Sequence, residues 1–224
     1  TFSLEQTPRN VTSRWYPTHV VFAPDDSHLL VSLCHTVRTD YCRTAKYHFA
    51  AKRWEFLPAE PNLTYRWPVY SPDGSWFVST VYECNQAYRC AFENWSLMRF
   101  SADGKEARLL AKTNARRTHF SPDGKRLIYQ TRKGGTDVAE FDLTTGRERL
   151  LTQFSLSGGG DAQTSPLFLG DGRRYVFNVS LHSHVNTRGT QFDASTWQGL
   201  NGMVSGNLDE VPIGQENFQK LFHL

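Results

Sequence analysis

Arginine and aromatic side chains recur at related points of this 224-residue sequence, and they are its best candidates for a binding site. A guanidinium pairs with a carboxylate through two parallel hydrogen bonds, and Arg, Trp and Tyr often dominate binding energy once they are desolvated. This chemistry suits the recognition of a protein or of a polysaccharide. The expected partner-binding set is Arg38, Tyr41, Arg66, Trp67, Tyr88, Arg89 and Arg117.

Histidine residues provide a weaker alternative, which is a metal site. His182 and His184 are two positions apart, so their side chains project to the same side of a strand. His19 is the third candidate ligand, at the start of a repeated segment. The same pattern fits unrelated loop imidazoles, so we predict no cofactor and keep the metal site as the alternative.

Sequence motifs for catalysis are absent. The chain contains no G-x-S-x-G, H-E-x-x-H, Walker A or G-x-G-x-x-G pattern. Without a convergent acid, base and nucleophile, the sequence favours a non-catalytic protein. The net charge of +3 is too weak to predict nucleic-acid binding. No apolar run approaches the about 18 residues that a membrane-spanning helix needs.

Four segments of the chain align with one another without gaps. The elements that they predict must position the candidate binding residues. Each segment has an aromatic residue, then a turn that contains Asp, then an apolar run. Pro and Asp favour such a turn, and Gly supplies its positive φ, so each segment predicts a β-hairpin. The aromatic residues are Phe22, Tyr70, Phe120 and Phe168, at intervals of 48, 50 and 48 residues.

Further strands follow the first hairpin of each repeat, most clearly at residues 137–143 and 147–152. Four strands in every 40–50 residues are typical of a β-propeller blade. We therefore predict an all-β fold, a β-propeller with at least four four-stranded antiparallel blades, as a single domain over residues 1–224. Residues 182–224 do not complete a clear blade. The expected blades are 17–60, 61–114, 115–160 and 161–224, and residues 1–16 are a possible outer closing strand.

The turn sequence Phe120-Ser-Pro-Asp-Gly-Lys125, followed by Asp142-Leu-Thr-Thr-Gly146, resembles the TolB-type propeller repeat. This resemblance implies six or more blades, so the propeller is expected to be incomplete, with missing segments or a partner chain that completes it. A closed ring of four blades is the alternative. The family also includes oligogalacturonate lyases, which implies a metal-dependent, carbohydrate-active enzyme as the alternative function. Pro17 stands where that pattern expects a second histidine.

Four cysteines lie in equivalent loops of the first two repeats. Cys34 and Cys42 flank the loop between the second and third strands of the first repeat, and Cys84 and Cys90 flank the same loop of the second. The repeat therefore favours local disulfides 34–42 and 84–90 over the other pairings. The spacings do not match usual zinc sites. Two disulfides indicate an oxidising compartment, so we expect a periplasmic, secreted or cell-surface protein.

Alternating strand direction places the two cysteine-flanked loops and the connections between blades at one end of the strands. The predicted partner-binding residues share that end. We therefore expect a non-catalytic, extracytoplasmic propeller that binds a protein or polymer partner there.

Overall fold

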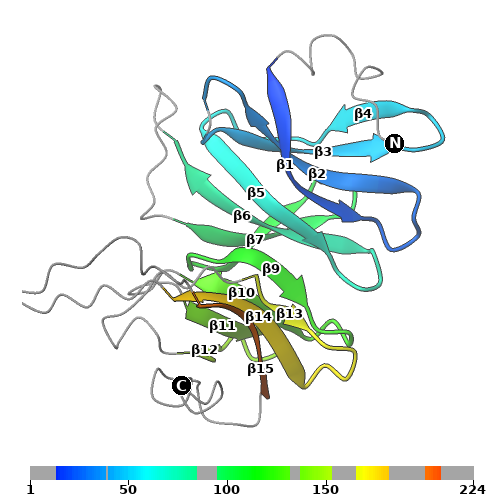
Figure 1. Ribbon diagram of the computed structural model, residues 1–224. Helices are drawn as coiled ribbons and strands as arrows, with labels where there is room; N and C mark the ends of the chain where they lie inside the picture. Colours follow the sequence, from blue (N-terminus) through cyan, green and yellow to red (C-terminus); the bar gives the residue numbers. More distant parts are fainter. Residues whose placement is uncertain are drawn as a thin grey trace, which may run out of the picture. The chain divides into compact units, whose positions relative to one another are not determined.

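The computed structural model describes residues 14–38, 40–84, 95–131, 137–152, 165–181 and 200–207. The regular elements in these ranges are β-strands (Figure 1). None of the described residues belongs to a helix long and apolar enough to cross a membrane. The chain divides into two compact units, residues 1–120 and 121–224.

The first unit contains two complete four-stranded antiparallel sheets with sequential strand order. The first sheet consists of β1 (Trp15–Phe22), β2 (His28–His35), β3 (Cys42–His48) and β4 (Arg53–Phe56). The second sheet consists of β5 (Leu63–Tyr70), β6 (Trp76–Glu83), β7 (Ser96–Ser101) and β8 (Ala107–Ala111). Each sheet corresponds to one predicted blade.

The remaining strands form the third and fourth sheets. The third consists of β9 (Arg116–Phe120), β10 (Arg126–Thr131), β11 (Asp137–Asp142) and β12 (Glu148–Leu150), again in sequential order. The fourth consists of β13 (Leu167–Phe168), β14 (Arg174–Leu181) and β15 (Leu200–Asn207). The predicted all-β propeller fold is confirmed.

The fourth sheet differs from the prediction of four strands, because it has three in the described part of the chain. Its third strand, β15, lies within residues 182–224, where the sequence does not complete a clear blade. Gly202 and Gly206 lie within β15, and glycine lowers strand propensity. Pairing with β14 over eight residues compensates for this weak local preference.

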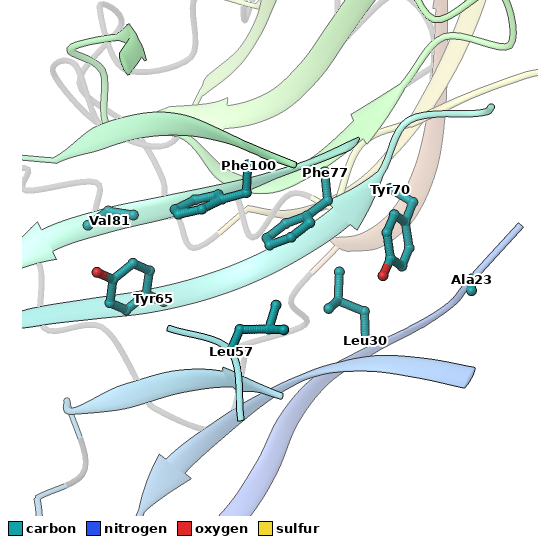
Figure 2. Close-up of a cluster of buried hydrophobic side chains, with 8 residues drawn as sticks. All are labelled: Ala23, Leu30, Leu57, Tyr65, Tyr70, Phe77, Val81 and Phe100. Atoms are coloured by element: carbon teal, nitrogen blue, oxygen red, sulfur yellow. The ribbon is translucent and has the colours of Figure 1, made fainter. Parts of the chain in front are cut away.

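A hydrophobic cluster joins the first two sheets (Figure 2). Within it the rings of Phe77 and Phe100 are stacked, with centroids 5.0 Å apart. Burial of each such side chain stabilises the fold by about 1.5–3 kcal/mol. Because residues of both blades share this cluster, the first blade packs on the second, and their loops lie next to each other. The cluster contains Ala23, Leu30 and Leu57 from the first blade and Tyr65, Tyr70, Phe77, Val81 and Phe100 from the second.

Candidate functional site

A disulfide closes the loop between β2 and β3. Cys34 and Cys42 are directly opposite in the register of the two strands, and their sulfurs are bonded. Both residues are fully buried. The predicted pairing is thus confirmed, in preference to a zinc site. Cys84 is also disulfide-bonded, and its predicted partner Cys90 lies outside the described residues.

The loop closed by this disulfide is held by backbone hydrogen bonds. The Thr36 N–H donates to the Arg14 carbonyl at 2.7 Å, and the Tyr41 N–H donates to the Arg38 carbonyl at 2.8 Å. The Val37 and Arg38 N–H groups both point at Nδ1 of His35, at 3.2 Å. An acceptor at Nδ1 requires a neutral ring, and burial together with nearby arginines lowers the pKa of His35 accordingly. Arg38 is left exposed on an anchored backbone.

Arg66, on β5 of the second blade, ties this loop to its neighbour. Its Nε donates to Sγ of Cys42 at 3.0 Å, and its guanidinium lies 3.7 Å from the carboxylate of Asp40. The Thr64 hydroxyl accepts from the Cys42 N–H at 2.6 Å and donates to the Asp40 carbonyl at 2.7 Å. Two adjacent blades therefore restrain the same loop.

Trp67 follows Arg66 at an irregularity in the pairing of β5 with β6. Its φ of 51° is in the left-handed region, and its N–H donates to the Ser32 hydroxyl at 3.1 Å. Arg117 has a φ of 50° at the aligned position of the third repeat. A bulge of this kind redirects the side chain that it carries. The sequence alone shows the repeat but not this change in register.

Aromatic rings and guanidinium groups pack together around Trp67. The Trp95 ring lies 5.7 Å from Trp67 and stacks on Tyr82 at 4.7 Å. The Arg116 guanidinium lies 4.3 Å over Trp95 and 5.7 Å over Trp67, and Arg66 lies 5.6 Å over Trp67. Cation–π contacts of this type contribute about 0.5–2 kcal/mol each. Burial raises the pKa of Tyr82 to about 12. Trp67 is half-buried, so part of its ring remains accessible.

The structure brings some of the predicted binding residues together. Arg38, Tyr41, Arg66 and Trp67 surround one loop end. Tyr41 also packs against Trp15, with ring centroids 5.8 Å apart. Tyr88 and Arg89 lie outside the described residues.

Two members of the aromatic cluster were not part of the predicted binding set. Tyr82 is hidden in an apolar strand pattern, and Trp95 directly precedes β7. The sequence shows that both residues are aromatic, but it does not show which face of the sheet each side chain occupies.

His19, one of the three candidate metal ligands, is half-buried near the positive charge of Arg117. Burial is the main cause that lowers its pKa, the positive charge of Arg117 lowers it further, and a hydrogen bond with the Pro68 backbone opposes both. Within the described ranges, no group of three His, Cys, Asp or Glu side chains is arranged to hold a metal ion. His182 and His184 lie outside those ranges.

Comparison with solved structures shows similarity to TolB and to other β-propeller proteins. TolB from Acinetobacter baumannii matches with a TM-score of 0.55 and 15% identity, over 75% of this chain and 41% of that one. Putative TolB from Agrobacterium tumefaciens matches at 0.56 and 20%, over 74% and 54%. An oligogalacturonate lyase in complex with manganese matches at 0.55 and 14%, over 73% and 45%.

These similarities establish the fold. The chain spans about half the length of the structures it matches. No family model matches the sequence, and no curated protein matches it.

Proposed function

We propose that this chain is a non-catalytic, extracytoplasmic β-propeller protein that binds a protein or polysaccharide partner through the end bearing the Cys34–Cys42 loop. The observation that carries the proposal is the double restraint of that loop. The disulfide closes it within the first blade, and Arg66 and Thr64 hold it from the second. Arg38 is thereby presented to solvent from an ordered backbone.

Preorganisation is what makes such a loop suited to binding. Each rotamer-rich side chain that is immobilised on association costs about 0.5–1.5 kcal/mol, and a loop that is already ordered loses less. Arg38, Tyr41 and the accessible part of Trp67 supply the residue types that contribute most when a partner desolvates them. Arg117 is exposed and provides a further guanidinium in the same unit.

An extracytoplasmic location is proposed on two grounds. A disulfide between fully buried cysteines is characteristic of proteins that fold in oxidising compartments. The resemblance of the turn motif to TolB-type repeats supports the periplasm, the cell surface or secretion.

The test begins with identification of a ligand, by glycan array and by capture from the periplasmic or extracellular fraction. The affinity of the identified ligand is then measured for the double variant Arg38→Ala/Tyr41→Ala, which we expect to bind at least tenfold more weakly. Tyr88→Ala/Arg89→Ala tests the equivalent loop of the second blade.

The matched control is Asp123→Ala/Lys125→Ala, in the turn between β9 and β10. We expect its affinity to stay within twofold of the parent. Loss of binding in the control, with unchanged affinity in both loop variants, would place the binding site at the other end of the blades.

A further inference from the structure

The third and fourth strands of the first three blades carry charged residues at the same register position. The first and third blades each combine opposite charges, and Arg149 forms an ion pair with Glu140. The second blade combines two arginines, and like charges directly across neighbouring strands are destabilising. The register pairs are Lys46 with Glu55, Arg99 with Arg108, and Glu140 with Arg149.

In the described part of the chain, the guanidinium groups of Arg99 and Arg108 have no protein acceptor. Among the residues that the structure describes, the side chains of Arg99 and Arg108 have no hydrogen-bond or ion-pair partner. Arg99 is half-buried, 4.1 Å over the ring of Trp76, and Arg108 is exposed. Burial and Arg108 lower the pKa of Arg99, and the charge of Asp73 opposes them. The Asp73 carboxylate is itself bonded by the hydroxyls of Ser71 and Ser75.

Both arginines line one pocket of about 400 Å³, on the same blade as Trp76. The hydroxyl-bearing Ser75 and Ser101 and a single acidic residue, Glu106, complete its polar lining. Two guanidiniums against one carboxylate give this pocket a positive formal charge.

The corresponding pocket beside Lys46 in the first blade has the opposite balance. It measures about 390 Å³ and is lined by Lys46 together with two carboxylates, Asp25 and Asp73. The Lys46 ammonium already donates to the Ala102 carbonyl at 2.6 Å. Of these two pockets, the one in the second blade therefore has the excess of positive charge.

We propose that Arg99 and Arg108 bind a tetrahedral oxyanion, the phosphate or sulfate group of a larger ligand. A guanidinium donates two parallel hydrogen bonds to an oxyanion. A carboxylate carries a single negative charge, so it leaves one of two guanidinium charges without a counterion. A phosphate or sulfate group offers three or more oxygens and so satisfies two guanidiniums from adjacent strands, while a dianionic one neutralises both charges. This site is independent of the loop end described under the proposed function.

The test uses inorganic phosphate as the probe, with calorimetry and phosphorus NMR on the whole chain at constant ionic strength. We expect saturable binding to the parent protein and at least tenfold weaker binding to Arg108→Gln and Arg99→Gln. Arg53→Gln, an exposed arginine on the fourth strand of the first blade, is the matched control and should bind like the parent. No saturable binding to the parent, or equal affinity in all three variants, would overturn the proposal.

A competition experiment and a further variant also test the proposal. Sulfate should compete with phosphate and acetate should not, so acetate binding of equal strength would overturn the tetrahedral assignment.

Arg108→Glu gives the second blade an opposite-charge pair like those of the first and third blades. It should abolish phosphate binding and raise the melting temperature, and because Arg108 is exposed this variant should fold. Retained phosphate binding in Arg108→Glu would contradict the proposal.

Discussion

Hydrogen-bond directions around His28 show which of its ring nitrogens carries a hydrogen. The Ser27 hydroxyl donates its only hydrogen to Asp25 at 2.7 Å, so it must accept from Nδ1 of His28, also 2.7 Å away. In a neutral ring with its hydrogen on Nδ1, Nε2 of His28 accepts from the Tyr70 hydroxyl at 2.8 Å. Burial, the first cause that lowers the pKa of His28, favours the same neutral ring. One side chain thus connects a buried phenol with an exposed carboxylate.

Ile128, on β10, is the sharpest single-residue test of the core. Its side chain is completely buried, and an unpaired carboxylate in such a position costs several kcal/mol or more. We expect Ile128→Asp to unfold its unit, as measured by circular dichroism during heating. Ile128→Val is the control and should cost only about 0.5–1.5 kcal/mol. A soluble, cooperatively folding Asp variant of parental stability would contradict the burial of this strand.

At the scale of elements, the turn of the first hairpin recurs in all four repeats, and the first repeat lacks the glycine that the other three have there. Gly74, Gly124 and Gly172 have positive φ at aligned positions, whereas the first repeat has Asp26 there with a φ of 55°. Glycine adopts this conformation without the penalty that a Cβ introduces, and aspartate tolerates it better than most residues. The turn is therefore preserved in the first repeat at some cost.

A reciprocal pair of substitutions measures that cost. Asp26→Gly should stabilise the protein by about 0.5–1 kcal/mol, because it relieves the strained φ. Gly74→Ala should destabilise it by about 1 kcal/mol, since its added Cβ only reaches ordinary contact with Pro24 at 3.4 Å and the backbone supplies most of the penalty. Denaturant midpoints measure both. Stabilisation by Gly74→Ala would show that the turn relaxes to another type.

At the scale of the whole molecule, partly buried histidines make stability depend on pH. Burial is the leading cause that lowers the pKa of four of them below the ordinary value of 6.5: His19, His28, His35 and His119. As the pH falls below 6.5, the unfolded chain binds protons that the folded chain does not, so stability decreases until the lowered folded values are reached. The turn aspartates do not act in this window, because their pKa values are lowered from 3.8.

We therefore expect a lower urea midpoint at pH 5.5 than at pH 7.5. His28→Asn should reduce the difference, because it removes one of the titrating groups. A midpoint that is constant or rises as the pH falls would contradict the protonation states assigned here. The same titration monitored by histidine NMR shows which rings carry the effect.

Much of the architecture was predictable from the sequence because its causes are local. The Pro-Asp-Gly turns specify hairpins through the φ preferences of three adjacent residues, and Asp73 and Asp123 accept the expected backbone hydrogen bonds. Constant spacing then predicts blades, and equivalent loop positions predict the Cys34–Cys42 disulfide. The strand β15 escaped prediction because its glycines leave pairing with β14, a long-range interaction, as the main source of its order.

The candidate sites were decided mainly by tertiary structure. Arg66 and Trp67 were recognisable as binding residue types, but their contacts with Cys42 and Trp95 arise only when the first blade packs on the second and β5 shifts register. The opposition of Arg99 and Arg108 likewise depends on the pairing of two strands. Turn chemistry acts over a few bonds and can be read from residue order. Which charged groups and aromatic rings come into contact depends on which faces of the sheets pack together, and only the tertiary structure determines that.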